Sequence, residues 1–364
     1  MPSVPDGSGT APVAPAAPAA SAPLAPPPAP AAPITSAAPP APAAASGAPV
    51  ASAAPAPRVI AVVVTYNRRD LLLEALAAVQ AQTRPADAVI VVDNASTDGT
   101  AAAVRRQYPT AGVTELASNT GGAGGFACGM ALALDQSADL VWLMDDDTVP
   151  EPGALRALLD ARESYPAYPS SPPALLASRV VWTDGRAHPM NTPRAKPFAG
   201  RAEREAAAAA GCMPIRSASF VSILVDAGVS RERGLPQADY FLWNDDFEFT
   251  TRVLRGNAGL LCPASIVVHK TAAFGSTDSD PGQRFFYEVR NKIWTLRARA
   301  PLAPGERVLY GGSTLRRWAR TFAKSRDRRA LGQCLVKGAV AGVRTSPRPT
   351  SEVLASVGLK SPVR

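Results

Sequence analysis

The stretch RVIAVVVTYNRRDLLLEALAAVQAQTRPADAVIVVD, residues 58 to 93, contains two apolar segments separated by an amphipathic one. RVIAVVVTY is rich in β-branched residues and lacks polar alternation, which predicts a strand buried on both faces. NRRDLLLEALAAVQAQ repeats its apolar residues at helical spacing, and DAVIVVD predicts a second buried strand. A strand, a helix and a strand in this order predict a parallel pair joined by a crossover helix.

The same alternation continues to residue 150. STDGTAAAVRRQY and GGAGGFACGMALALDQ are predicted helices, and GVTEL and DLVWLMD are predicted strands. We therefore predict an α/β fold with a mostly parallel central sheet and helices on both faces. Ligands of such sheets bind beyond the carboxyl ends of the strands, where Asp93 and Asp145 are expected.

Beyond Pro150 the pattern is less regular. EPGALRALLDARESY predicts a helix, ALLASRVVW a strand, and residues 183 to 211 a polar insertion, after which SASFVSILVDAGV is again apolar. LPQADYFLW predicts a short strand, followed by a helix from about Asp245 to Arg255 that ends at Gly256. A further strand is predicted to end at His269. We expect this half to receive a second substrate.

The chain divides by composition into three parts. Residues 1–57 are rich in Pro, Ala and Ser, with no Lys or Arg and one acid, which predicts a disordered arm. A proline-rich ligand for an SH3-like partner is the alternative. Residues 58–300 are the predicted folded domain, whose two halves meet at residue 150. Neither a signal-peptide pattern nor an apolar run long enough to cross a bilayer is evident.

Residues 301–364 form a predicted basic, helical C-terminal tail. They carry 13 Lys and Arg against three acids, a net charge of +10, whereas the whole chain is +8. Five apolar residues interleave with these charges at partly helical spacing: Leu315, Trp318, Phe322, Leu331 and Leu335. An anionic membrane surface is the favoured partner, and packing of the tail on the domain is the alternative. We expect no nucleic-acid partner, because the excess charge does not surround the predicted site.

The four cysteines, at 128, 212, 262 and 334, show no zinc-type spacing. Reduced thiols are therefore expected, as in a cytosolic protein.

Three aspartates directly follow the fourth predicted strand, in DLVWLMDDDTVPEP, residues 139 to 152. Adjacent carboxylates repel at the rim of a core, so a cation or hydrogen-bond donors should lie there. Alternate residues of an extended chain point the same way, so Asp145 and Asp147 should face one site and Asp146 another. Their oxygens suit Mg²⁺ or Mn²⁺, which in turn suit a diphosphate. The structural alternative is an acidic turn that caps the helix beginning near Glu151.

A second acidic cluster, Asp245, Asp246 and Glu248, lies in the first turn of a predicted helix. Alone it would complement the helix dipole without a catalytic role. Together with a metal site upstream, it supplies the carboxylate that a group transfer needs as general base on an acceptor hydroxyl. We favour Asp245, because it directly follows Trp243 and Asn244 and should project furthest into the acceptor site.

The two histidines differ in their expected roles. His269 ends an apolar strand, where a lone histidine is usually structural. It becomes a metal-ligand candidate because the two aspartates offer too few ligands for a six-coordinate ion. His188, in the polar insertion, is assigned no role.

The segment GGAGGFA contains a GxGxxA pattern, formed by Gly122, Gly124 and Ala127. The pattern fits a dinucleotide fingerprint, but it follows the third predicted strand and not the first. We interpret the glycines as letting backbone N–H groups approach a nucleotide-linked group, with an oxidoreductase as the alternative.

Taken together, VVVTYNR, VVDNASTDGT, SNTGGAGGFACGM, WLMDDDTVP, WNDDFEF, VVHK and GQRFFYEVRNKIW closely resemble bacterial family 2 glycosyltransferases. The combination of NTGGAGGF with DDD is most similar to actinobacterial galactofuranosyltransferases and to related rhamnosyltransferases. This resemblance covers residues 58 to 300. It implies that they are a catalytic domain with a nucleotide-sugar half at 58–150 and an acceptor half at 151–300. It implies a glycosyltransferase A fold, a nucleotide-sugar donor, a divalent metal, inversion at the anomeric carbon and a lipid-linked cell-envelope acceptor.

The resemblance also implies roles for individual residues. Thr65 and Asp93 would hold the nucleotide base, and Asn119 with the loop of Gly121, Gly122 and Gly125 would line the donor. Ribose, metal and diphosphate would be bound by Asp145 and Asp147, and His269 would complete the metal shell. Asp245 or Asp246 would be the base, and Trp243 would line the acceptor site. Asn244 departs from the family pattern, which has Gly or a charged residue there.

We therefore expect a cytosolic glycosyltransferase, peripheral at the inner face of the membrane, that transfers galactofuranose from UDP-galactofuranose with Mn²⁺ or Mg²⁺. The runner-up donor is dTDP-rhamnose. A sugar nucleotidyltransferase would need similar residues but would release pyrophosphate. A non-catalytic binding protein is a third hypothesis, against which the two intact acid clusters argue.

Overall fold

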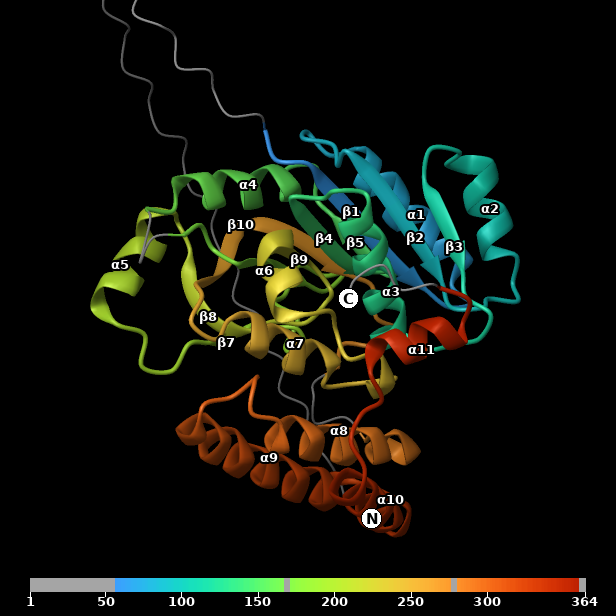
Figure 1. Ribbon diagram of the computed structural model, residues 1–364, viewed down its shortest axis with the longest axis vertical. Coiled ribbons are helices and arrows are strands. Elements are labelled where there is room, and N and C mark those ends of the chain that lie inside the picture. The colour runs from blue at the N-terminus through green and yellow to red at the C-terminus, as the bar shows by residue number, and fades with distance from the viewer. Residues whose placement is uncertain (1–55, 167–170, 276–279, 360–364) are drawn as a thin grey trace, which may run out of the picture. The chain divides into compact units, whose positions relative to one another are not determined.

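The computed structural model describes residues 56–166, 171–275 and 280–359. The predicted disordered arm, apart from its last two residues, lies outside these ranges. The described chain forms a ten-stranded sheet in the order β3-β2-β1-β4-β9-β6-β10-β8-β7, with β5 paired to β10 (Figure 1).

The strands are β1 (Val59–Thr65), β2 (Ala88–Asp93), β3 (Gly112–Glu115), β4 (Leu140–Asp145), β5 (Thr148–Pro150), β6 (Leu175–Val181), β7 (Arg194–Ala195), β8 (Met213–Ser217), β9 (Ile223–Asp226) and β10 (Gly259–His269). The helices are α1 (Arg69–Gln80), α2 (Thr100–Gln107), α3 (Gly121–Asp135), α4 (Ala154–Ser164), α5 (Arg201–Ala209), α6 (Ala227–Arg233), α7 (Asp245–Val253), α8 (Phe285–Arg297), α9 (Pro304–Lys324), α10 (Arg328–Arg344) and α11 (Thr350–Ser356).

The first half of the sheet matches the sequence prediction. Strands β1, β2, β3 and β4 run parallel, and every residue of β1 is buried, as its unbroken β-branched sequence requires. Successive side chains of β1 enter two different cores. Ile60 and Val62 contact α3, and Val59 and Ala61 belong to the core covered by α1, α2 and α4. Helices therefore cover both faces, as predicted.

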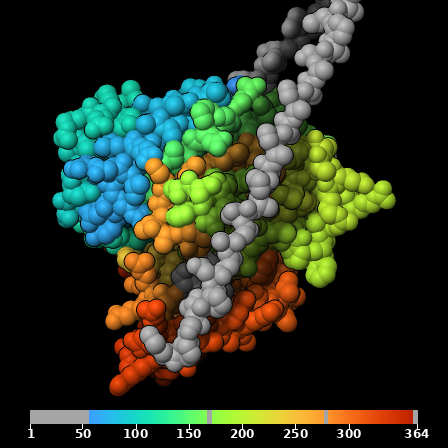
Figure 2. All heavy atoms as spheres, turned by 180° about the vertical axis from the view of Figure 1, so that it is seen from behind, coloured from blue at the N-terminus to red at the C-terminus, as the bar shows by residue number. Residues whose placement is uncertain are grey.

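The second half departs from the sequence prediction at two places. The supposed polar insertion contains α5, which has a buried face that includes Ala206 and Ala207 and joins the core beside α4. Figure 2 shows the chain around α5 projecting from the body. The predicted short strand in LPQADYFLW is instead a 3₁₀ turn, Ala238–Tyr240. Its aromatic residues pack locally and do not join the sheet, since Tyr240 contacts Trp294 of α8.

The C-terminal helices bury the apolar side chains that the sequence prediction had assigned to a membrane. Trp318 and Phe322 of α9 pack edge-on against Phe285 of α8, and Leu331 and Leu335 of α10 join the same cluster. Only Leu315 of the predicted five is largely exposed. Helix α11 returns to α3, where Leu354 is fully buried (Figure 1). Within the described ranges, none of the helices combines the length and apolar character that a membrane span needs.

Candidate active site

The polar ends of four strands meet at one edge of the sheet. Thr65 of β1 pairs in register with Asp93 of β2, and Asp145 ends the parallel neighbour β4. His269 ends β10, where it pairs with Thr148 directly after the three aspartates. The parallel register thus brings Thr65, Asp93 and Asp145 together, and the antiparallel pairing of β5 with β10 adds His269.

Asp145, Asp147 and His269 form a cluster that could hold a metal ion. Each contributes a ligand atom, and these atoms lie within 4.8 Å of one another. Asp147 Oδ1 is buried, lies 3.0 Å from His269 Nε2 and makes no hydrogen bond of good geometry with the described residues. Two carboxylates and an imidazole suit Mg²⁺ or Mn²⁺, so the residues fit the ion that the sequence predicted.

His269 is held in the orientation that a metal ligand requires. Its Nδ1 lies 2.9 Å from Asn191 Oδ1, which accepts from Nδ1–H, so Nε2 faces the aspartates and is the ring nitrogen left to bind a metal. Behind it lies fully buried His188, with ring centroids 5.1 Å apart and a hydrogen bond to Thr271. Asn191 and His188 both come from the segment predicted to be a polar insertion, and the sequence analysis assigns no role to either.

Asp146 faces away from this cluster, as the alternation predicted. Its Oδ2 accepts a hydrogen bond from Thr65 Oγ1 at 2.8 Å, and its Oδ1 lies 3.3 Å from Arg68 Nη1. The same guanidinium nitrogen donates to Asp147 Oδ2 at 2.6 Å. Arg68 thus supplies part of the positive charge that three adjacent aspartates require, a contact that the sequence prediction missed although VVVTYNR contains it.

The pKa values of the three aspartates differ because of their surroundings. Burial, reinforced by the charge of Asp147, raises the pKa of Asp145 to about 7. Burial also raises the pKa of Asp146 to about 6, against the opposing effect of Arg68. At Asp147 burial also raises the pKa, but His269 and Arg68 outweigh it, so the pKa is lowered. A cation at the cluster would stabilise the ionised form of Asp145.

The residues predicted to bind the nucleotide have internal partners. The hydroxyl of Thr65 is bound to Asp146, and Asp93 Oδ1 accepts from the backbone N–H of Ser96 at 2.8 Å. Asn119 Oδ1 accepts from the N–H of Gly121 at 2.7 Å, at the start of α3. These residues border the strand ends, and their contact with a nucleotide stays a prediction.

Most glycines of the GGAGG segment serve close packing. A Cβ on Gly121, which has φ +70°, would lie 1.9 Å from the carbonyl oxygen of Phe241. At Gly125 a Cβ would lie 2.4 Å from the side chain of Val64, so α3 approaches β1 closely there. A Cβ at Gly122 would meet nothing within 4 Å, and this residue lines the cavity described below. Of the predicted donor glycines, Gly122 is thus the one with open space beside it.

The loop before α7 has an unusual backbone. Phe241, Trp243 and Asn244 have φ values of 64°, 65° and 65°, in the left-handed region that side chains disfavour. Asn291 of α8 holds this loop, because its Nδ2 donates to the carbonyls of Tyr240, Leu242 and Trp243 at 2.8 to 2.9 Å. Backbone strain of this kind persists where the surroundings over-determine it, often at functional sites.

Asn244, which departs from the family pattern, has a clear structural role. It immediately precedes α7 and its Nδ2 donates to Glu288 Oε2 of α8 at 2.8 Å. Its side chain makes no capping bond to α7. Asn244 therefore ties the start of α7 to α8.

Asp245 and Asp246 begin α7, as predicted, but differ in exposure. Asp245 is only 7% exposed, and its pKa is raised well above the usual value by burial, then by the charges of Asp246 and Asp145. Asp246 is less buried, and its Oδ1 accepts from the N–H of Phe247 at 2.6 Å. Asp245 is thus the more buried of the two, although both line the cavity described below, and which of them reaches an acceptor hydroxyl stays a prediction.

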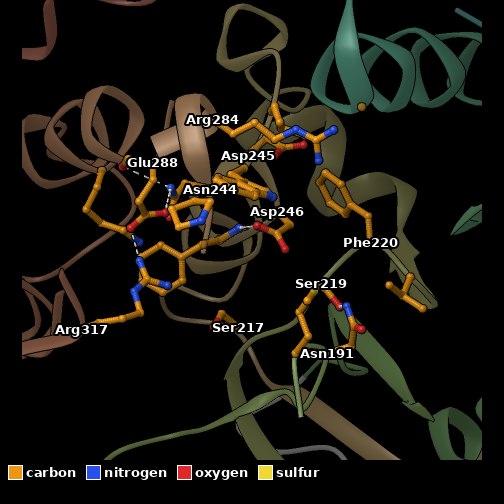
Figure 3. A pocket seen from close by; sticks show the side chains of 18 of the residues that line it. Asn191, Ser217, Ser219, Phe220, Asn244, Asp245, Asp246, Arg284, Glu288 and Arg317 are labelled. Carbon is orange, nitrogen blue, oxygen red and sulfur yellow. Dashed lines mark hydrogen bonds and ion pairs between the residues drawn. The ribbon is translucent and has the colours of Figure 1, made fainter. Parts of the chain in front are cut away.

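A cavity of about 930 Å³ connects these groups. Its lining includes Asp145 and His269 at the metal cluster, Trp243, and both aspartates of α7. Figure 3 shows Asp245 and Asp246 at this cavity, opposite Ser219 and Phe220 and next to Asn244 and Glu288. One space therefore borders a metal-type cluster and a pair of carboxylates.

A sheet edge with a D-x-D pair, a histidine from a distant strand and an acid pair on the same cavity suits a glycosyltransferase. The glycosyl transferase family 2 model matches residues 60–221. Galactofuranosyltransferase GlfT1 of Mycobacterium tuberculosis is 34% identical over 278 residues. The comparison covers 71% of this chain and 86% of that protein. The chain belongs to glycosyl transferase family 2.

Two further comparisons agree with this assignment. Galactofuranosyltransferase GlfT1 of Mycolicibacterium smegmatis is 42% identical over 115 residues, 31% of this chain and 38% of the relative. The crystal structure of S. aureus TarS in complex with UDP-GlcNAc aligns with a TM-score of 0.50 and 17% identity, covering 78% of this chain and 81% of that one. This likeness shows the glycosyltransferase A fold, which confirms the fold prediction.

Proposed function

We propose that this glycosyltransferase inverts the anomeric carbon and transfers galactofuranose from UDP-galactofuranose to a lipid-linked cell-envelope glycan. The observation that carries the proposal is the single cavity bordered by Asp145, His269 and the acid pair of α7. The galactofuranosyltransferase names of its relatives support the choice of sugar. Inversion requires a base on the acceptor side and a stabilised leaving group on the donor side.

The residues divide into donor and acceptor groups. Asp145, Asp147 and His269 would hold a divalent ion, which supplies Lewis-acid stabilisation of the departing nucleoside diphosphate. Asn191 keeps the Nε2 of His269 available for this task. On the other side, a carboxylate of α7 accepts the proton of the acceptor hydroxyl as that oxygen attacks the anomeric carbon, and the bond to the diphosphate breaks. Trp243 also lines the cavity and would contact the acceptor.

Donor choice is tested with purified protein, Mn²⁺ and a panel containing UDP-galactofuranose and dTDP-rhamnose. We expect nucleoside diphosphate release with UDP-galactofuranose that increases when a glycan acceptor is added. Preference for dTDP-rhamnose would identify a rhamnosyltransferase. Release of pyrophosphate from a nucleoside triphosphate and a sugar phosphate, without diphosphate release, would instead indicate a nucleotidyltransferase.

We also propose a peripheral position at an anionic membrane surface. Of the five apolar residues in the sequence prediction, four pack within the C-terminal helices, so the support is the set of exposed arginines. They lie on α9 and α10 and between them: Arg316, Arg320, Arg326, Arg328 and Arg329. Each such charge contributes about 1 kcal/mol near an anionic surface. Binding to anionic vesicles in a flotation assay should therefore fall steeply as salt rises. Equal binding to neutral vesicles would contradict an electrostatic attachment.

A further inference from the structure

A small second cavity lies next to the large one, between α9 and the start of β7. It measures about 140 Å³, several times the ~30 Å³ that one water takes in the liquid. Four of its lining residues, Arg194, Phe247, Lys292 and Arg317, also line the large cavity. The two spaces are therefore adjacent on the side where the acid pair lies.

The lining of the small cavity is cationic. Arg194, Lys292, Arg317 and Arg320 line it, together with hydroxyl-bearing residues of α9 such as Thr314. No carboxylate is among its described lining residues. The hydroxyl groups can donate hydrogen bonds without adding negative charge. This combination of cations and neutral donors matches the requirements of an anion.

Lys292 is the unusual member of this group. It is 3% exposed, yet among the described residues its ammonium has no hydrogen-bond or ion-pair partner, and it lies 4.0 Å from the centroid of the Phe247 ring. The guanidinium of Arg194 lies 5.5 Å from the same ring. Burying an unpaired ammonium is costly, so its position indicates a ligand that the protein is built to receive.

The nearest acids neutralise only part of this charge, because Glu288 pairs with Arg317 and no described carboxylate forms an ion pair with the other three cations. Glu288, one turn before Lys292 on α8, already accepts from Arg317, from Trp318 Nε1 at 3.1 Å and from Asn244. Asp246 lies near enough for Lys292 and Arg194 to lower its pKa, against the rise caused by burial. The pKa of Lys292 itself falls to about 7, mainly through burial, with Arg317 and Arg194 adding to the fall and Glu288 and Asp246 opposing it. The positive charge is thus in excess.

We propose that this cationic cavity binds the diphosphate through which the acceptor glycan is attached to its lipid carrier. The inference rests on the proposed function, which supplies the lipid-linked acceptor. Anchoring the diphosphate beside Phe247 would bring the attached glycan into the large cavity, toward Asp246. The donor diphosphate would occupy the separate cluster of Asp145, Asp147 and His269.

The test measures binding by calorimetry in the presence of a chelator, without any sugar donor. The probes are geranyl diphosphate, uncharged geraniol and inorganic pyrophosphate. We expect wild-type protein to bind geranyl diphosphate and not geraniol, and saturating UDP to leave this binding unchanged. Binding of pyrophosphate as strong as that of geranyl diphosphate would identify a free-anion site and overturn the assignment to a lipid carrier. Displacement by UDP, or no binding of geranyl diphosphate, would also overturn it.

Two variants and one control connect the binding to the cavity. Lys292→Met and Arg320→Gln should each weaken geranyl diphosphate binding by about 10-fold or more, the effect of losing a charge-assisted contact. Arg320 is exposed, so its variant should fold even where Lys292→Met does not. Arg344→Gln makes the same charge change on α10 outside the cavity and should bind like the wild type. Unchanged binding by Arg320→Gln would overturn the proposal.

This assay is independent of the proposed transfer reaction. Loss of binding in the cavity variants, with no sugar transfer by wild-type protein, would contradict the proposed function and leave the anion site in place. Donor-dependent transfer by wild-type protein that binds no geranyl diphosphate would support the proposed function and overturn the diphosphate site.

Discussion

Asp147→Asn is expected to reduce glycosyl transfer by at least about 10²-fold, the usual cost of losing a preorganised charge at a developing anion. Asp147 Oδ1 faces His269 Nε2 at 3.0 Å, so the amide replaces a carboxylate in the proposed metal shell. Asparagine keeps the size of the side chain, which limits the structural effect. Mn²⁺ affinity, followed by electron paramagnetic resonance of the purified protein, should fall together with activity.

The same exchange at Asp135 provides the control. Asp135 is exposed at the end of α3, away from the cluster, so Asp135→Asn should bind Mn²⁺ and transfer sugar like the wild type. Thermal unfolding checks the fold of Asp147→Asn, because Asp147 Oδ2 also accepts from Arg68. Full activity of the wild type in excess chelator, or unchanged Mn²⁺ affinity in Asp147→Asn, would remove the metal from the mechanism.

The first half of the fold was predictable because its information is local. Each strand from β1 to β4 is a short apolar run, each helix has its own period, and parallel strands place their last residues at one edge. That logic was sufficient to bring Thr65, Asp93 and Asp145 together. It also separated Asp146 from its two neighbours, because alternation along an extended chain depends only on sequence position.

The rest of the site depends on contacts between distant segments. Asn191 reaches His269 across 78 positions, and Asn291 reaches the loop before α7 across about 50. No periodicity or spacing indicates such pairs, and polar segments such as 183–211 are easily interpreted as insertions. The same limitation affected the tail: helical spacing identified the apolar face of α9, but only the structure shows that α8 covers it.

The choice of base also required the structure. The sequence favours Asp245, whereas the structure shows three residues with positive φ before α7 and buries Asp245 directly after them. A general base must first reach the proton that it accepts. Asp246 has the greater exposure and lies beside the cationic cavity, so we now propose Asp246 as the base.

Asp246→Asn is therefore expected to lower transfer by about 10² to 10⁴-fold, the range for losing a general base. The amide oxygen can still accept from the N–H of Phe247, which now binds Asp246 Oδ1 at 2.6 Å, so the helix start should remain intact. Donor affinity should stay near the wild-type value, because the change acts on the acceptor side. A fall in kcat with an unchanged donor dissociation constant, measured by single-turnover kinetics and equilibrium binding, is the expected signature.

Asp245→Asn is the matched comparison, since it makes the same exchange one residue away on the same helix. Asp245 is buried and its pKa is raised by burial and by the neighbouring Asp246 and Asp145, so these surroundings favour an uncharged side chain and should accept an amide. We expect a smaller loss of transfer, accompanied by a change in donor or Mn²⁺ affinity. If Asp245→Asn instead shows the kcat signature and Asp246→Asn stays active, the buried aspartate is the base and approaches the acceptor only after the site rearranges. If both variants remain active, the acid pair serves the helix dipole alone, and the acceptor hydroxyl loses its proton to another group.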